Sequence, residues 1–187
     1  MELIDALDQG YTEFGRRVEQ VADDQWGNPT PCTEWTVRDL VNHVVAEHLW
    51  APPLLQGASL EEVGDRFDGD VLGEDPRQAW ERASAHAQPA FHRPGALDLQ
   101  VHTSGGMTDA SEYGWQMVND LAVHAWDLAR GIGADDHLDE ELARTLYDRM
   151  APVADRWRSA GVFGPAVEVP EDAPAQDRLV AVLGRHP

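Results

Sequence analysis

Apolar positions recur at helical spacing along several long segments of this chain. Between Ile4 and Val21 they step alternately by three and four residues, which predicts an amphipathic helix of about five turns. Further helices of the same kind are predicted to begin near Thr36, at Asp75–Pro76, at Thr108 or Asp109, and near Asp139. Each of these helices has an apolar stripe to bury, and an antiparallel bundle buries such stripes most simply. The pattern therefore predicts an all-α fold.

Proline and glycine mark the positions where the predicted helices end. The expected ends of the second, third and fourth helices are Pro52–Pro53, Pro89 with Pro94–Gly95, and Gly131 with Gly133. Pro152 is expected to kink or restart the fifth helix. Of the helices that these breaks delimit, four long ones, one of them broken, are expected to form the bundle, and the rest of the chain to form short accessory elements.

The remaining segments are shorter and less regular. Residues 57–75 are expected to form a loop with a short helix at 60–63, and residues 96–102 fit either one arm of a small hairpin or an extended loop. From residue 161 the chain is predicted to be extended, with a short helix over residues 175–183. We therefore expect two domains, a four-helix bundle over residues 1–160 and a C-terminal arm over residues 161–187 that packs on it.

Charge and cysteine content narrow the classes of partner. The chain has 14 basic residues, all of them arginine, against 34 Asp and Glu, so its formal net charge is −20. This excess argues against nucleic acid and anionic membrane as partners. No apolar run is long enough to span a membrane and no signal pattern opens the chain, so we expect a cytoplasmic protein. The single cysteine, Cys32, excludes an internal disulfide and a metal knuckle built on several cysteines.

Three residues on two predicted helices form a candidate metal site. Asp120 and His124 lie four residues apart, so their side chains share one side of the helix and can converge on one point. His43 on the second helix is the expected third ligand, provided that the two helices are neighbours. Two imidazoles and one carboxylate form a ligand set of catalytic zinc sites, which leave a coordination position open. The alternative is a simple hydrogen-bonded Asp120–His124 pair.

Three runs of the sequence carry a resemblance to a known family. They are residues 26–44 (WGNPTPCTEWTVRDLVNHV), 120–129 (DLAVHAWDLA), and the C-terminal segment from 163–170 (FGPAVEVP) to 175–179 (AQDRL). With these runs the chain resembles the actinobacterial metal-binding proteins of the DinB-like superfamily, whose described relatives are mycothiol-dependent maleylpyruvate isomerases. The likeness extends over nearly the whole chain.

The resemblance implies a fold, a cofactor and an activity. The fold is a four-helix bundle of up-down-down-up order, and the ion is zinc, or else nickel or another divalent ion, held by His43, Asp120 and His124. The implied function is that of a metal-dependent mycothiol S-transferase or isomerase-like enzyme, which acts on a small electrophile as a monomer or homodimer. In the isomerases the middle ligand is typically Glu, one methylene longer than Asp120. The alternative function is a non-catalytic metal- or ligand-binding helical module.

Two acidic residues near the candidate ligands have more than one interpretation each. Glu47 lies one turn beyond His43, so it is a catalytic base beside the ion, an extra ligand, or a solvated helix residue. Asp127 follows His124 by three residues, so it either orients that imidazole from behind or caps the nearby loop.

Three further residues are candidates for substrate binding. Arg38 binds a substrate carboxylate or else pairs with Asp39 or Glu34. His48 lines the site or else is a satisfied core histidine. His102, on the segment that fits a hairpin, is expected to line the cleft. Cys32 is given no nucleophilic role, because it lies far from any base in the sequence.

Overall fold

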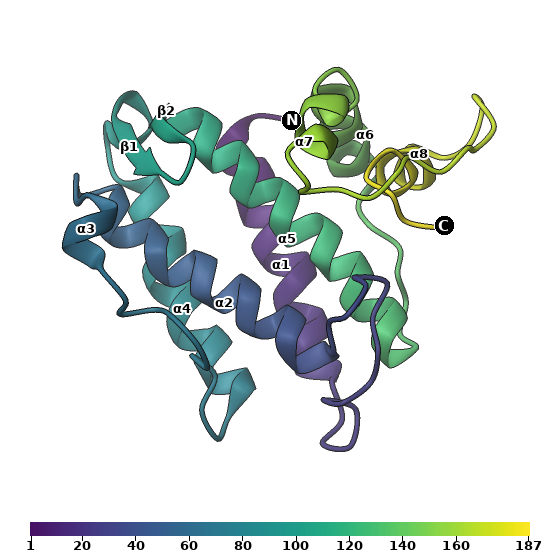
Figure 1. The fold of residues 1–187 in the computed structure, drawn as a ribbon, viewed down its shortest axis with the longest axis horizontal. Helices are drawn as coiled ribbons and strands as arrows, with labels where there is room; N and C mark the ends of the chain where they lie inside the picture. The colour runs from purple at the N-terminus through teal and green to yellow at the C-terminus, as the bar shows by residue number, and fades with distance from the viewer. The chain divides into compact units, whose positions relative to one another are not determined.

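The computed structural model describes residues 1–187, and its larger unit is a closed bundle of four helices (Figure 1). The helices are α1 (Leu3–Gln20), α2 (Val37–Leu54), α4 (Pro76–His92) and α5 (Ala110–Ile132). α1 packs against α4 and α5, and α2 packs against the same two helices. Figure 1 shows α1 and α5 running one way and α2 and α4 the other. The predicted all-α fold and its up-down-down-up order are thus confirmed.

Local signals start the helices where the sequence pattern predicts. The Thr36 hydroxyl accepts a hydrogen bond from the Asp39 amide, and the Asp39 carboxylate accepts one from the Thr36 amide at 2.9 Å. This reciprocal arrangement satisfies two amides that have no partner inside α2. Asp75 caps α4 in a similar way, with Pro76 as the first helical residue. No helix is long and apolar enough to cross a membrane.

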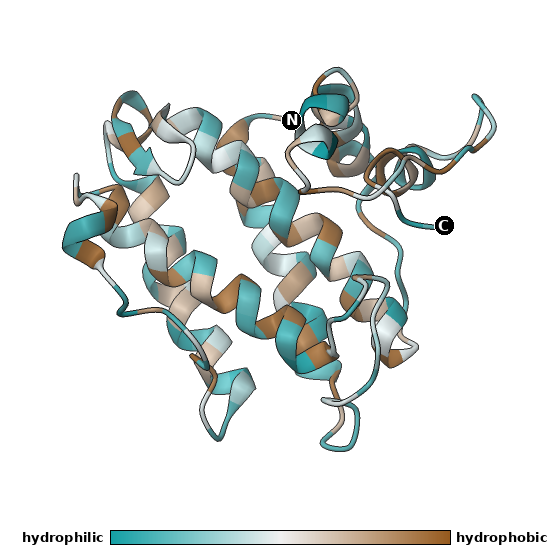
Figure 2. Cartoon of the chain, in the orientation of Figure 1, coloured by the Kyte–Doolittle hydropathy of each residue, from teal (hydrophilic) through white to brown (hydrophobic).

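The bundle core is densest along α5. Its residues from Leu121 to Ala129 are all buried, so this helix is covered on more sides than a single apolar stripe requires. Glycines bring α1 and α5 close together, since a Cβ atom on Gly10 would lie 3.2 Å from the Leu121 Cβ atom. Figure 2 shows the apolar residues gathered along these bundle helices, with polar residues between them. α5 is therefore the buried element that carries two of the three candidate ligands.

One predicted helix end, that of α2, is wrong, and α4 ends between its two predicted markers, Pro89 and Pro94–Gly95. α2 runs through Pro52 and Pro53 to Leu54, and α4 runs past Pro89 to His92. Proline removes one helical hydrogen bond and crowds the preceding turn. In both helices the turn that contains the proline also buries apolar side chains, Leu54 in α2 and Phe91 in α4. Packing of these side chains outweighs the local preference of proline for the end of a helix.

A small hairpin connects α4 to α5. β1 (Gln100–Thr103) pairs with β2 (Gly106–Asp109) in antiparallel register, and α5 begins directly after β2. Of the two readings of residues 96–102, the hairpin is therefore correct. The short helix predicted at 60–63 is α3 (Leu60–Val63), which Ser59 and Glu62 cap.

The second compact unit comprises Met1 and residues 135–187. It contains α6 (Glu140–Met150), α7 (Ala154–Ser159) and α8 (Ala175–Val182), and α6 packs against α8. The helix restarts after Pro152, as one of the two predicted outcomes. Contacts divide the chain near residue 135, whereas the sequence pattern places a domain boundary at residue 160. That boundary, and the packing of the arm on the bundle, stay predictions.

Candidate metal centre

The two helices α2 and α5 bring the three predicted ligands together. The Asp120 Oδ1 atom lies 3.2 Å from the His43 Nε2 atom and 3.3 Å from the His124 Nε2 atom. The two imidazole rings stand edge to face, with their centroids 5.2 Å apart. His43 and Asp120 are half-buried, and His124 is buried. The neighbouring helices that the sequence hypothesis requires are therefore present.

This arrangement fits a divalent cation. One ligand atom from each residue lies within 4.8 Å of the other two. Ligand atoms about 2 Å from a tetrahedral ion lie roughly 3.3 Å from one another. The second carboxylate oxygen of Asp120, Oδ2, is buried and has no hydrogen-bond partner. Buried carboxylate oxygens are rarely left without a partner, so this atom is a further reason to place a cation here.

Strong mutual electrostatics hold the three side chains in place. Burial alone would raise the pKa of Asp120, but the two imidazoles beside it hold that pKa well below its usual range. Burial would lower the pKa of His124, but Asp120 raises it well above its usual range, and the same balance raises the pKa of His43. In the metal-free protein, protons held by the imidazoles therefore supply part of the positive charge that a cation would supply.

Asp127 supports His124 from behind. Its carboxylate is completely buried and accepts a hydrogen bond from the His124 Nδ1 atom at 3.0 Å. Of the two predicted roles, orienting the imidazole matches this geometry. The bond keeps a proton on Nδ1, so Nε2 is the ring atom that takes either a second proton or a metal ion beside Asp120 and His43.

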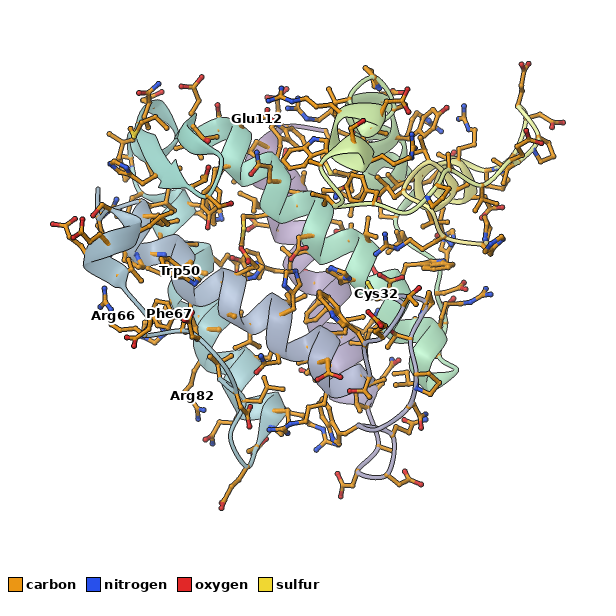
Figure 3. The ribbon with its side chains drawn as sticks, viewed as in Figure 1. Cys32, Trp50, Arg66, Phe67, Arg82 and Glu112 are labelled. Atoms are coloured by element: carbon orange, nitrogen blue, oxygen red, sulfur yellow. The ribbon has the colours of Figure 1, made fainter.

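A loop before α2 covers the same end of the site. The side-chain amide of Asn28 donates a hydrogen bond to the Gly131 carbonyl at 3.1 Å, which ties this loop to the last turn of α5. The Trp35 ring lies 4.8 Å from the His43 ring and 5.7 Å from that of His124, centroid to centroid. Cys32, labelled in Figure 3, brings its thiol within 4.8 Å of ligand atoms of His124 and Asp127. No spacing of residues along the chain predicts this approach of Cys32.

Further polar groups extend from the ligands into the bundle. Burial, and then the charge of Asp120, raise the pKa of Glu47. Burial and the charge of Glu47 raise the pKa of Tyr113, whose hydroxyl has no partner. Sequence reasoning missed Tyr113, although it precedes Asp120 by two helical turns and so shares its side of α5.

His48 is buried and only half-satisfied. Its Nδ1 atom donates to the Val44 carbonyl at 2.8 Å, while Nε2 has no partner. Its ring centroid lies 5.1 Å from that of Tyr11, whose hydroxyl also has no partner. This is a core histidine whose second ring nitrogen has no hydrogen-bond partner. Its role in substrate binding stays a prediction.

Arg38 and His102 lie outside the group of ligands. The Arg38 guanidinium contacts the Asp70 carboxylate at 2.8 Å and the Gly73 carbonyl at 2.8 Å. The expected ion pair with Asp39 or Glu34 is therefore wrong, because the 57–75 loop folds back to the start of α2. His102 is exposed on β1. The substrate-binding roles of both residues stay predictions.

Sequence comparison finds relatives along the whole chain. The family model described as the mycothiol maleylpyruvate isomerase N-terminal domain matches residues 7–129. Two uncharacterized proteins of Mycobacterium tuberculosis, MT0763 and Rv0738, are each 33% identical over 191 residues. Each match covers 99% of this chain and 98% of the relative. These relatives therefore share the full extent of the chain.

Structural comparison finds the same fold. The crystal structure of a mycothiol-dependent maleylpyruvate isomerase matches with a TM-score of 0.63 and 22% identity, and a mutant of that enzyme matches with 0.64 and 21%. Each match covers 92% of this chain and 76% of the other. At this identity the likeness concerns the fold.

Proposed function

The chain belongs to the mycothiol maleylpyruvate isomerase N-terminal domain family, and from this premise we propose that it is a metal-dependent thiol enzyme. It would join a low-molecular-weight thiol, with mycothiol as the candidate, to a small electrophile in an S-transfer or isomerisation reaction. The single observation that supports this most is the position of Asp120 between two imidazoles, with its second oxygen buried and without a partner.

His43, Asp120 and His124 would hold the ion, with zinc as the candidate. Three protein ligands leave a position for an exogenous molecule, which is typical of catalytic rather than structural zinc sites. A cation bound there supplies positive charge that favours the nucleophilic thiolate form of a thiol beside it. Asp127 keeps the proton of His124 on Nδ1, so that Nε2 remains available as a ligand.

Glu47 and Tyr113 would serve the reacting molecules. Glu47 lies one turn beyond His43, and burial raises its pKa, which favours the protonated carboxyl group that a proton donor needs. We assign it the role of general acid–base toward the electrophile. The buried Tyr113 hydroxyl would donate a hydrogen bond to a bound molecule, which satisfies a group that has no partner in the protein alone.

Charge supports small molecules as the partners. With a formal net charge of −20, the protein repels nucleic acid and anionic membranes. We therefore propose a cytoplasmic enzyme whose partners are a thiol and an electrophile.

Thiol consumption tests this function. The protein is loaded with one equivalent of zinc and given mycothiol. Loss of free thiol in the presence of small electrophiles reports S-transfer, and conversion of maleylpyruvate reports an isomerisation, in which the thiol is released again. We expect metal-dependent turnover that falls at least a hundredfold in Asp120→Asn, which keeps the size of the side chain but removes the charge of a ligand. Glu47→Gln should lower kcat while zinc stays bound, because the residue acts on protons rather than on the ion.

Two results would contradict the proposal. Zinc-loaded protein without turnover on any electrophile would favour the non-catalytic binding module. Turnover that is unchanged after the metal has been removed with a chelator would overturn the role of the ion.

A further inference from the structure

A second group of potential metal ligands lies on the other side of the His124 ring. Cys32, His124 and Asp127 each bring one ligand atom within 4.8 Å of the other two. Within this group the Asp127 Oδ2 atom lies 3.0 Å from the His124 Nδ1 atom. The first site uses the opposite nitrogen, Nε2, which faces Asp120 at 3.3 Å. The two groups therefore share His124 through different ring atoms.

Tertiary contacts hold Cys32 near this ring. The Val37 amide donates to the Asn28 carbonyl at 2.9 Å, and the Thr30 amide donates to the Trp35 carbonyl at 3.2 Å, so both ends of the loop are fixed. Gly131 lets the loop lie against α5, since a Cβ atom there would be 3.3 Å from the Pro29 carbonyl oxygen and 3.1 Å from Val37 Cγ2. The position of Cys32 is thus set by the fold rather than by a free loop.

We propose that Cys32, His124 and Asp127 form a second metal site, specific for a thiophilic divalent cation such as zinc, cadmium or cobalt. Thiolate, imidazole and carboxylate are the three ligand types that zinc takes in proteins. On binding, the thiol and the Nδ1 atom of His124 each give up a proton to solvent as the metal–sulfur and metal–nitrogen bonds form, and His124 keeps a proton on Nε2. Asp127, which is completely buried, changes from hydrogen-bond acceptor to ligand and keeps a positive partner throughout.

Sharing His124 makes the two sites antagonistic. A neutral imidazole has one lone pair and one N–H group, so an ion at Nε2 leaves the proton on Nδ1, where Asp127 accepts it. An ion at Nδ1 requires the opposite tautomer, with the proton on Nε2 facing Asp120. Occupying both sites would require removal of the second ring proton. A thiophilic ion at the second site therefore withdraws His124 from the first.

Cobalt(II) is the probe for this site. A cobalt–thiolate bond gives an intense near-ultraviolet charge-transfer band, and Cys32 is the only cysteine in the chain, so the band reports on this residue alone. His43→Ala disables the first site and leaves the second intact. Titrated with cobalt in thiol-free buffer, this variant should show the band and bind one ion. Adding Cys32→Ser should abolish the band and weaken binding at least tenfold.

Further variants distinguish a site of three ligands from metal binding by Cys32 alone. In the His43→Ala background, Asp127→Asn and His124→Ala should each weaken cobalt binding at least tenfold, and unchanged binding in both would overturn the site. Asp120→Asn disables the first site in a second way and should retain the band. Absence of the band in both His43→Ala and Asp120→Asn, with circular dichroism unchanged, would also overturn it.

The wild-type protein tests the antagonism. One equivalent of zinc at the first site should weaken cobalt binding to Cys32 at least tenfold relative to the His43→Ala variant. Equal affinities would contradict the sharing of His124. These measurements do not require thiol turnover, so a failure of the proposed enzymatic function leaves their outcome interpretable.

Discussion

His124 is the residue on which the chemistry of this protein converges. One of its ring nitrogens faces Asp120 at 3.3 Å and the other faces Asp127 at 3.0 Å, and the side chain is buried between them. Burial disfavours the charged imidazolium, but the two carboxylates more than compensate, and the pKa of His124 is raised well above its usual range. In this environment, His124 is therefore stabilised either by a second ring proton or by a metal ion.

His48 gives the pH dependence that is simplest to interpret. Burial lowers its pKa from 6.5 to about 4. The unfolded state binds this proton first as the pH falls, so the protein should lose stability between about pH 6.5 and pH 4, by up to about 3 kcal/mol. His48→Asn keeps a donor for the Val44 carbonyl but cannot titrate, so its loss of stability over this range should be smaller by that amount.

Urea denaturation of both proteins at several pH values measures this difference. The other histidines are present in both proteins, so their contributions cancel in the comparison. Parallel stability curves for wild type and variant between pH 4 and pH 6.5 would show that His48 takes up its proton equally in the folded and unfolded states.

Part of the site is predictable at the scale of residues. The spacing of Asp120 and His124 places two ligands on one side of a helix, and helical periodicity places His43 beside the buried face of another. The approach of Cys32 is not predictable in this way. It depends on hydrogen bonds between residues about a hundred positions apart, such as Asn28 to Gly131, which no local pattern encodes.

Helix α2 is the element on which the first ligand depends. Thr36 and Asp39 cap it, seven and four residues before His43. Thr36→Ala removes the hydroxyl that accepts a hydrogen bond from the Asp39 backbone amide. It should therefore lower the free energy of unfolding by about 1 kcal/mol. Thr36→Ser, which keeps the hydroxyl, should cost much less. Chemical denaturation of both variants measures the difference, and equal stability of the two variants would mean that the cap contributes nothing.

Elements were predictable where local signals and packing agree. The starts of α2 and α4 coincide with capping residues, and Asp75–Pro76 combines a cap with a proline at the first helical position. Helix α2 continues past its predicted end at Pro52–Pro53, and α4 continues past Pro89 but ends before Pro94, because burial of Leu54 and Phe91 outweighs the local signal of the earlier prolines. Tertiary packing of this kind cannot be read from a single segment.

Net charge is the dominant electrostatic property of the whole molecule. The formal charge of −20 produces repulsion among surface carboxylates, while exposed ion pairs such as Arg38–Asp70 contribute little to stability. Salt screens both the repulsion and the ion pairs, but the repulsion among carboxylates is the larger of the two effects. Raising NaCl from about 10 mM to 300 mM should therefore raise the melting temperature by several degrees, because the screening length falls from roughly 30 Å to below 10 Å.

Thermal unfolding at pH 7 measures this salt effect, and the same series near the sequence pI of about 4.5 is the control. With little net charge left, salt should lose its stabilising effect there. A melting temperature that falls with salt at pH 7 would show that attractive pairs, rather than repulsion, control the surface electrostatics.

Elemental analysis of protein purified without added metal tests the central proposal most directly. We predict about one divalent ion per chain in the wild type and in His48→Asn, the matched histidine control, and less than a tenth of an ion in His124→Ala. A His124→Ala protein that retains the same ion at the same stoichiometry would contradict the assignment of His43, Asp120 and His124 as the metal centre.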